Sequence, residues 1–385
     1  MDKIRIAIDG NEANVTNRVG SNVYAFGLLK ALKPLIDNSS RYSATVFLRQ
    51  PPRPELPKPS PNWQYQLLPA RGFWVYWAFP RYLFAHANEF DVLYSPGHYL
   101  PLISPIPTVV SIMDLGFHHY PSNFTFADWL KLSIGTKRSV QQAQRIVAIS
   151  HFTRSELMQH YHCGSEKILV APPAPPKKLE LTTDQLTQIL RPFKLNQPFF
   201  LYLGTLQPRK NILNLVKAYE IYAKNFQPSK QLPELPKLVL AGKVGWLAQP
   251  ILAAIENSPY QKEIVRLGFV TDQQKAALLT RALSSISISQ YEGFGIPALE
   301  ALQYGTVPIV ANTAGLPEAV GQAGFHVSPY SPVKIANQLD HVTRLNYLER
   351  LQLRKKARAQ VKQYSWEDSA QVALKAIRQA SKHAK

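Results

Sequence analysis

The sequence predicts an α/β protein with two similar domains, each built on a parallel sheet that helices cover. Short apolar runs alternate with segments of helical periodicity along nearly the whole chain, a pattern typical of β-α-β units. A proline cluster at residues 171–176 interrupts this alternation, and the same pattern restarts at Phe199. Because few contacts cross a proline-rich boundary, we expect one domain over residues 1–175 and another over residues 195–365. A ligand site between the two is the default expectation.

Apolar runs mark the expected strands. They cover residues 4–8, 42–48, 90–94, 108–113, 146–149 and 167–170 in the first domain, and 199–203, 237–240, 284–289 and 307–310 in the second. A helix is expected over residues 23–32, with Gly20 just ahead of it. The proline-rich stretch 49–62 is expected to be an exposed loop.

Composition excludes several classes of protein. No stretch of the 385 residues approaches the ~20 uncharged apolar residues of a membrane span. The nearest stretch, residues 72–84, is interrupted by Pro80 and Arg81, and we expect it to pack as a helix or loop. The N-terminus reads as a strand without a signal-peptide cleavage region. Cys163 is the only cysteine, which excludes an intramolecular disulfide and agrees with a cytoplasmic location.

The charge is strongly positive. Lysine and arginine number 44 against 25 acidic residues, which gives a formal charge of +19. Such an excess attracts anions, and charge alone leaves nucleic acid, an anionic membrane face and phosphorylated small molecules open. Because no zinc-ligand spacing and no basic helix with interleaved aromatics occurs, we expect no nucleic-acid partner.

The most informative local pattern follows the apolar run that begins at Ser284. The run leads into QYEGFGIPALEALQYG, in which Pro297 stands where the first helical residue is expected and Gly305 where the helix stops. Gly293-Phe294-Gly295 then forms a tight turn between the end of a strand and the start of a helix. Unpaired N–H groups and the positive end of the helix dipole point there, an arrangement that suits a phosphate.

Two glutamates bracket this turn. The Glu292 carboxylate precedes it and can accept hydrogen bonds from sugar hydroxyls, although a solvated loop residue is the alternative. Glu300 is expected within the first helical turn, where complementing the helix dipole is the alternative role.

A second turn of this kind follows residues 199–203. Arg209 and Lys210 stand at the end of that strand, and Asn211 is a favourable N-cap for the amphipathic helix after it. Two adjacent cations can neutralise a diphosphate, the arginine as a fork and the lysine as a point charge. The alternative is a basic loop on a basic protein.

Together these segments resemble a known family. LYLGTLQPRKNILNLVKAY, LVLAGKVGW, LGFVTD and SISQYEGFGIPALEAL occur in order, and Glu292 and Glu300 form an E-x₇-E pair. The chain resembles the retaining glycosyltransferases of family 4 (glycosyl transferases group 1) over nearly its whole length, most strongly across residues 199–320. The resemblance implies the GT-B fold: two Rossmann-like domains facing across a cleft, with a C-terminal helix, residues 366–385, crossing back to the N-terminal domain.

The resemblance also implies roles for these residues. Arg209 and Lys210 would hold the donor diphosphate and stabilise it as it leaves. Glu292 would contact the transferred sugar near the reacting carbon, and Glu300 would hold ribose hydroxyls. The remaining donor-binding residues would be the glycine of the N-terminal loop and the turn between strand and helix: Gly20, Gly293, Phe294 and Gly295.

One segment departs from the family pattern. In VVSIMDLGFHHYP, Met113 occupies the place where the family commonly has histidine, and methionine cannot donate a proton. Asp114 remains as a candidate catalytic residue. His118 or His119 could compensate from the following loop, but each is more often a surface histidine.

The expected chemistry is electrostatic. The chain has no D-x-D motif for a divalent metal, so we expect no metal and no cofactor, with cations and N–H dipoles stabilising the leaving diphosphate. The resemblance implies a GDP- or UDP-linked donor, with GDP-mannose as the first guess. It also implies a glycan or lipid-linked acceptor and a role in polysaccharide biosynthesis. From the positive charge we expect, in addition, peripheral contact with an anionic membrane face, the inner one for a cytoplasmic protein.

Two other functions are weighed. Residues 293–298 match G-x-G-x-x-A, which would suit a dinucleotide oxidoreductase, but that fingerprint belongs in the first β-α-β unit of its domain. A non-catalytic sugar-nucleotide-binding protein could keep both the cation pair and the glutamates, and this alternative stays open.

Overall fold

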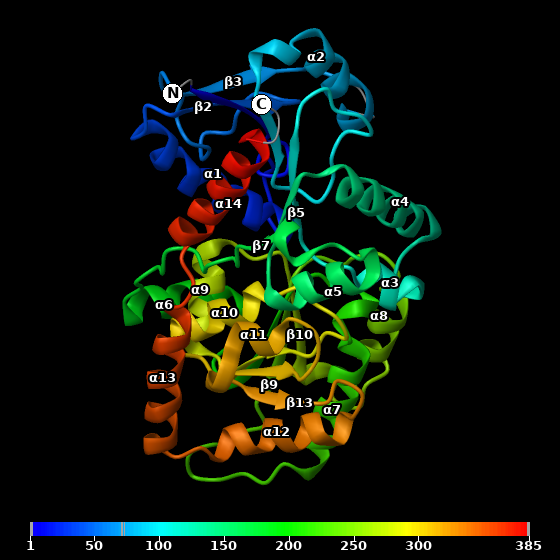
Figure 1. Cartoon of the computed structure of the whole chain (residues 1–385). Coiled ribbons are helices and arrows are strands. Elements are labelled where there is room, and N and C mark those ends of the chain that lie inside the picture. The colour runs from blue at the N-terminus through cyan, green and yellow to red at the C-terminus, as the bar shows by residue number, and fades with distance from the viewer. Residues whose placement is uncertain (1–2, 71, 73, 383–385) are drawn as a thin grey trace. The chain divides into compact units, whose positions relative to one another are not determined.

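The computed structural model describes residues 3–70, 72 and 74–382, which form two compact units (Figure 1). Unit 1 consists of Met1–His119, Phe126–Ala174 and Tyr364–Lys385, and unit 2 of Tyr120–Thr125 and Pro175–Gln363. Each unit holds one parallel sheet with helices on its faces, as the sequence predicts.

The sheet of unit 1 has seven strands in the order β3-β2-β1-β4-β5-β6-β7, all parallel. The strands are β1 (Ile4–Asp9), β2 (Tyr42–Leu48), β3 (Trp63–Leu67), β4 (Val92–Ser95), β5 (Thr108–Ile112), β6 (Arg145–Ala148) and β7 (Ile168–Val170). From β1 the chain adds strands first toward one edge of the sheet (β2, β3) and then, from β4 onward, toward the other edge, so the topological switch point lies between β1 and β4. In such sheets ligands bind beyond the carboxyl ends of the strands at this switch point.

Helices of unit 1 cover both faces of its sheet. They are α1 (Ser21–Asp37), α2 (Phe79–Ala85), α3 (Gly116–His119), α4 (Phe126–Gln142), α5 (His151–Tyr161) and α14 (Trp366–Lys382). Helix α1 lies just after Gly20, as expected, but it begins at Ser21, before the predicted start at residue 23, and continues beyond the predicted end at residue 32.

The C-terminal helix α14 packs in unit 1, which confirms the predicted return of the chain (Figure 1). The Trp366 ring lies 5.8 Å from the Tyr24 ring of α1, and Ser369 Oγ donates to Pro172 O at 2.5 Å. Four alanines and one isoleucine at helical spacing line its buried face: Ala370, Ala373, Ala376, Ile377 and Ala380. Residues 383–385 of the predicted helical segment lie outside the described residues.

The sheet of unit 2 has six strands in the order β10-β9-β8-β11-β12-β13, again all parallel. They are β8 (Phe199–Leu203), β9 (Lys237–Ala241), β10 (Ile264–Gly268), β11 (Ser284–Ser287), β12 (Pro308–Ala311) and β13 (Phe325–Val327). This is the strand order of a doubly wound nucleotide-binding sheet, and its switch point lies between β8 and β11.

Helices of unit 2 pack on this sheet through two apolar clusters, which take alternate residues of β8. They are α6 (Thr183–Leu190), α7 (Ile212–Asn225), α8 (Gln249–Glu256), α9 (Asp272–Arg281), α10 (Ile296–Tyr304), α11 (Leu316–Val320), α12 (Pro332–Arg344) and α13 (Tyr347–Val361). Phe200, Tyr219 and Ile286 are fully buried between the sheet and its helices. This rigid packing holds the strand ends that carry the predicted site.

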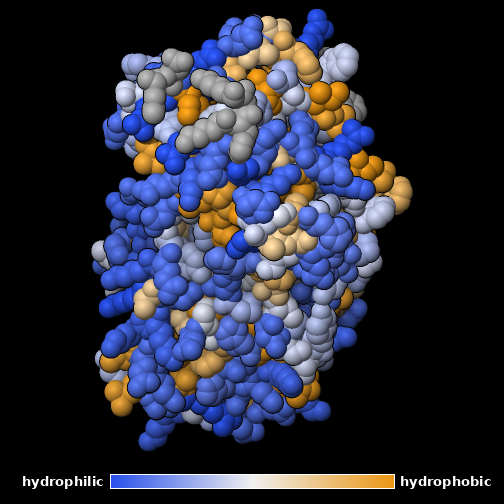
Figure 2. All heavy atoms as spheres, viewed as in Figure 1, coloured by the Kyte–Doolittle hydropathy of each residue, from blue (hydrophilic) through white to orange (hydrophobic). Residues whose placement is uncertain are grey.

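The surface of the molecule is largely polar on the face drawn in Figure 2, with apolar side chains in separate groups. Trp74 and Phe79, from the aromatic stretch at residues 72–84, are buried and stacked with ring centroids 4.6 Å apart. Trp77 of the same stretch is exposed. Among the described residues, no helix combines the length and the apolar character that crossing a bilayer requires.

Candidate functional site

Two loops meet at the switch point of unit 2. One follows β8 and contains the short 3₁₀ turn η6 (Pro208–Lys210), and the other follows β11. The backbone N–H of Gln290 donates to Arg209 O at 3.0 Å, which ties the loops together. The two segments that the sequence singled out are therefore neighbours at the place where the fold predicts a ligand.

Asn211 is the N-cap residue of α7, as predicted, but its side chain holds this junction instead of capping the helix. It precedes α7 with a left-handed backbone (φ 62°), and its side chain makes no capping bond to that helix. Instead Asn211 Nδ2 donates to Ile288 O at 3.1 Å and to Pro329 O at 2.7 Å. The amide reaches across the strand ends because β11 lies beside β8, a neighbour that local sequence does not reveal.

The centre of the site is an ion cluster. Lys210 Nζ donates to Glu292 Oε1, Arg209 Nη1 lies 3.7 Å from Glu292 Oε2, and Ser289 Oγ donates to Glu292 Oε1 at 2.7 Å. Arg209 Nη1 also donates to Tyr291 O at 3.2 Å. The three charged side chains are only 14%, 18% and 16% exposed, in the order Arg209, Lys210 and Glu292. The solvated-loop alternative for Glu292 is therefore wrong.

The charge state of Glu292 follows from this environment. Burial raises the pKa of the carboxyl. The positive charges of Lys210 and Arg209 and the hydrogen bonds from Lys210 and Ser289 lower it by more, so the pKa lies below its ordinary value. Glu292 is therefore ionised at neutral pH and neutralises part of the cation pair. An arriving diphosphate would compete with this carboxylate for the same two cations.

The turn Gly293-Phe294-Gly295 lies between β11 and α10, as predicted. Gly295 has φ 114°, a backbone conformation that favours glycine, and a Cβ there would stand 2.7 Å from Leu316 Cδ2, so the leucine side chain would also have to shift. Phe294 is buried. Helix α10 begins at Ile296, so Pro297 is its second residue rather than its first.

Glu300 lies one residue beyond the first turn of α10, so the prediction that placed it within that turn is wrong. Its carboxylate is buried and bonds to Lys275 of α9, with Lys275 Nζ to Glu300 Oε1 at 2.6 Å. Burial lowers the pKa of Lys275, but the Glu300 charge and hydrogen bond raise it above its ordinary value. The role of Glu300 in the fold is therefore an ion pair rather than complementation of the helix dipole. Lys275, its partner, could not be identified from the sequence.

The segment Tyr120–Thr125 also reaches this site. Asn123 Nδ2 donates to Gln290 Oε1 at 3.1 Å, and Trp246 Nε1 donates to Asn123 O at 2.7 Å. The Tyr120 hydroxyl lies 2.7 Å from that of Tyr330. These contacts support the loop that leads into Glu292.

The remaining predicted residues, Gly20 and Asp114, belong to unit 1. Gly20 precedes α1 with φ 52°, and a Cβ there would meet no atom within 4 Å. Asp114 Oδ1 accepts a hydrogen bond from the Gly116 N–H at 3.0 Å, which shapes the turn into α3. Met113 is buried.

The two histidines proposed to compensate for Met113 both contact helix α5. His118 Nε2 lies 2.7 Å from Tyr161 Oη, and His119 Nε2 contacts Glu156. Tyr161 and Glu156 both lie on α5, so these histidines join α3 to that helix.

His98 is the histidine that the structure places beside Met113, and the sequence analysis missed it. Met113 N–H donates to His98 Nδ1 at 3.3 Å, and His98 Nε2 bonds to Thr136 Oγ1 at 2.9 Å. Burial lowers the pKa of His98 to about 4, against the opposing charge of Asp114. The sequence signal that could have found it is SPGH, a proline-glycine turn that places a histidine just beyond the end of β4. In the structure His98 has a left-handed backbone (φ 60°).

Acid is expected to destabilise the protein through His98. Between pH 6.5 and 4 the unfolded chain binds a proton at this histidine that the folded chain does not, so the free energy of unfolding falls as pH falls. The full effect is roughly 3 kcal/mol. His98→Asn, which suits the left-handed backbone, should flatten this slope in chemical denaturation at several pH values. Burial raises the pKa of Asp9 to about 6, which acts in the opposite direction, so the variant must be compared with wild type. Equal slopes for the two proteins would contradict the prediction.

Two family models match the chain one after the other. The model for Glycosyltransferase Family 4 matches residues 20–174, and the model for Glycosyl transferases group 1 matches residues 189–363. The second range contains the ion cluster and Glu300.

Individual proteins agree with this assignment. The O-antigen chain mannosyltransferase B of Escherichia coli is 30% identical over 245 residues, which span 60% of this chain and 59% of that protein. Among solved structures, sucrose-phosphate synthase from Thermosynechococcus elongatus has a TM-score of 0.73 at 19% identity, covering 98% of this chain and 99% of that one. Anabaena Alr3699/HepE in complex with UDP and glucose has a TM-score of 0.71 at 16% identity, covering 97% and 98%. At these identities the two structures show the fold alone. The paired family models and the shared fold place the chain in the group 1 glycosyl transferases of family 4, with the GT-B fold.

Proposed function

We propose that this chain is a retaining glycosyltransferase that moves a hexose from a nucleotide diphosphate sugar to a glycan or lipid-linked acceptor. The observation that carries the proposal is the cluster of Arg209, Lys210 and Glu292 at the β8–β11 switch point. It joins two cations to a carboxylate beside the start of a helix, and these are the groups that a sugar diphosphate needs.

The proposed mechanism rests on charge. Breaking the bond between sugar and phosphate leaves a nucleotide diphosphate anion and a sugar with oxocarbenium character. Arg209 and Lys210 are held with little exposure, so they stabilise the developing negative charge without much rearrangement. When the diphosphate pairs with Arg209 and Lys210, the Glu292 carboxylate is released to contact the sugar. Glu300, which is paired with Lys275, accepts hydrogen bonds from the ribose hydroxyls.

The substrates are proposed from the relatives. A mannosyl donor, with GDP-mannose first and UDP-sugars second, is supported by the name of the Escherichia coli relative and by the UDP bound to the Anabaena protein. An O-antigen-like glycan or a lipid-linked glycan is the proposed acceptor. The charge of +19 supports peripheral contact with an anionic membrane face, and cosedimentation with anionic vesicles, but not neutral ones, would test it.

A donor screen tests the proposed function. The wild-type protein is incubated with GDP- and UDP-linked hexoses, and release of nucleotide is measured with and without glycan acceptors. We expect release from one donor class, with the anomeric configuration of the product retained. If every donor binds and none is turned over, the transferase proposal is wrong.

A second candidate function is sugar-nucleotide binding without transfer. The observation that favours it is Met113, a buried thioether where the family commonly has histidine. This candidate predicts nucleotide binding in titration calorimetry and no turnover in the same screen.

Transfer is expected to proceed without a divalent metal, because Arg209 and Lys210 supply positive charge at the proposed diphosphate site. Turnover in excess EDTA should equal turnover with added Mg²⁺ or Mn²⁺. A strict metal requirement, restored by Mg²⁺ after chelation, would contradict this prediction.

A further inference from the structure

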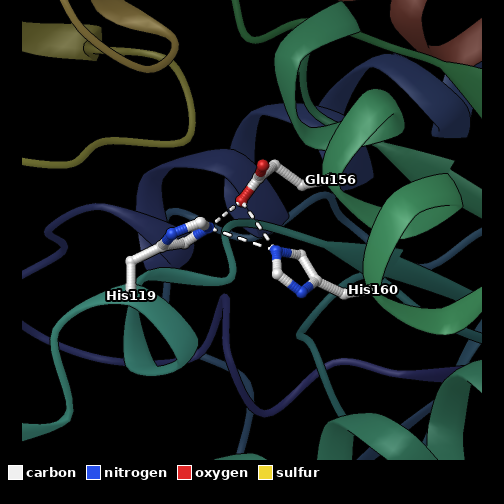
Figure 3. A group of neighbouring side chains, drawn as sticks. All are labelled: His119, Glu156 and His160. Atoms are coloured by element: carbon white, nitrogen blue, oxygen red, sulfur yellow. Dashed lines mark hydrogen bonds and ion pairs between the residues drawn. The ribbon is translucent and has the colours of Figure 1, made fainter.

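A second cluster of titratable side chains lies in unit 1, and the proposed transfer reaction does not use it. Figure 3 shows His119 at the end of α3 and Glu156 and His160 on α5, with their polar atoms turned toward one another. One ligand atom from each residue lies within 4.8 Å of the other two. Glu156 and His160 are four residues apart on one helix, which puts them on the same helical face.

The distances fit a small transition-metal ion. His119 Nε2 and His160 Nε2 are 3.3 Å apart, and Glu156 Oε2 lies 3.7 Å from His160 Nε2. Ligands held tetrahedrally at 2.0–2.1 Å from a zinc ion are separated by about 3.3 Å. The direct contact between His119 and Glu156 is the one that would open to admit the ion.

The burial of the three residues also suits metal binding. The Glu156 side chain is 9% exposed, whereas His119 and His160 are 36% and 27% exposed. The carboxylate therefore lies at the base of the cluster and the imidazoles at its rim, where an ion can enter from solvent. Two histidines and one carboxylate are a ligand set that zinc accepts, with a fourth position left for water.

A neighbouring histidine supports the cluster without joining it. The His118 ring lies parallel to the His160 ring, with centroids 5.2 Å apart and an interplanar angle of 3°. His118 Nε2 is already bonded to Tyr161 Oη at 2.7 Å. His118 therefore packs against one of the three side chains without being one of them.

We propose that His119, Glu156 and His160 form a binding site for a divalent transition-metal ion, with zinc as the best match. The ion joins α3 to α5, next to the point where the chain leaves unit 1 and enters the segment Tyr120–Thr125. The site is structural: the ion holds α3 against α5, and none of its three ligands belongs to the ion cluster of Arg209, Lys210 and Glu292.

The test is a zinc titration of tag-free full-length protein after dialysis against EDTA. We expect one Zn²⁺ per chain by calorimetry and a higher melting temperature when zinc is present. His160→Ala should weaken binding at least ~100-fold, since losing even an outer partner costs about 10–100-fold in affinity. Glu156→Gln keeps the shape of the side chain, removes its charge and should also weaken binding. Absorption spectra of the Co²⁺-loaded wild type should indicate a tetrahedral environment.

The matched control is His162→Asn. His162 follows the same helix with a left-handed backbone that asparagine tolerates, and it is not one of the three ligands. This variant should bind zinc as the wild type does. Circular dichroism checks that each variant is folded, and a misfolded His160→Ala is replaced by His119→Gln. If zinc does not bind at one per chain, or if binding persists in both His160→Ala and Glu156→Gln, the proposal is wrong.

The His160→Ala variant also distinguishes an effect of this metal site from a metal requirement of the transfer reaction. Chelation that acts through the His119 cluster should have no further effect on His160→Ala. A metal at the diphosphate would remain essential in that variant.

Discussion

Replacing Arg209 with alanine is expected to lower the turnover number by about 10²–10³-fold, the range found when one preorganised donor to a developing anion is removed. Arg209 bonds to Tyr291 O and lies 3.7 Å from Glu292, so its guanidinium is already held at the site before a donor arrives. Binding of free nucleotide diphosphate should weaken as well, but by a smaller factor, because the charge on the leaving group is greater in the transition state.

Steady-state kinetics with the full donor and calorimetry with the free nucleotide measure the two effects. Arg209→Lys keeps the charge but loses the fork, and should fall between the wild type and Arg209→Ala. Arg266→Ala is the matched control, because Arg266 is a more exposed arginine of β10 that pairs with Glu256 at 4.0 Å. Wild-type turnover in Arg209→Ala would show that the loop after β8 does not hold the diphosphate.

Glutamine substitutions of Glu292 and Glu300 are expected to separate binding from catalysis. Glu300→Gln should raise the KM for the donor and weaken the affinity for free UDP or GDP, because the ribose does not react. Glu292→Gln should lower kcat, because this carboxylate is proposed to act beside the transferred sugar. Contacts made equally in the ground and transition states change KM, and those made mainly in the transition state change kcat.

The ion cluster sharpens the expectation for Glu292→Gln. In the wild type the Glu292 carboxylate partly neutralises Arg209 and Lys210. Under the proposed function a diphosphate would have to displace it. Glutamine removes that competing charge, so affinity for the free nucleotide should be at least retained. The opposite result, in which Glu292→Gln abolishes nucleotide binding and Glu300→Gln does not, would overturn both assigned roles.

Glu256→Gln serves as the control for both substitutions. Glu256 ends α8, and its side chain is largely exposed. Its replacement should leave KM, kcat and nucleotide affinity unchanged. Melting temperatures of all three variants distinguish a lost substrate contact from a disturbed fold, which matters most for Glu300 because its carboxylate is buried against Lys275.

The central strands could be predicted from the sequence because both of their faces are buried. All five residues of β8 and all four of β11 are buried, and each strand reads as part of an unbroken run without lysine, arginine or acidic residues. The missed strands β3, β10 and β13 stand at sheet edges, where exposed positions admit polar residues such as those in WQYQL and IVRLG. Their pairing depends on a neighbouring strand rather than on their own pattern.

The same distinction, between local sequence pattern and tertiary neighbours, separates the site residues that could be predicted from those that could not. Arg209, Lys210 and Glu292 were identified because each follows an apolar strand or opens a helix. Their contacts with one another follow from β8 and β11 being adjacent. Lys275 was missed because it reaches Glu300 from a different helix.

The path of the chain has a consequence for folding during synthesis. Helix α14 supplies an alanine-rich buried face to unit 1, yet it is synthesised after all of unit 2. Until α14 is made, the surface of α1 that packs against Trp366 is not covered by this helix. Contacts between segments so far apart in the chain form slowly, and domains made first usually fold first. Here the order is reversed: the unit that the ribosome begins first completes its core last.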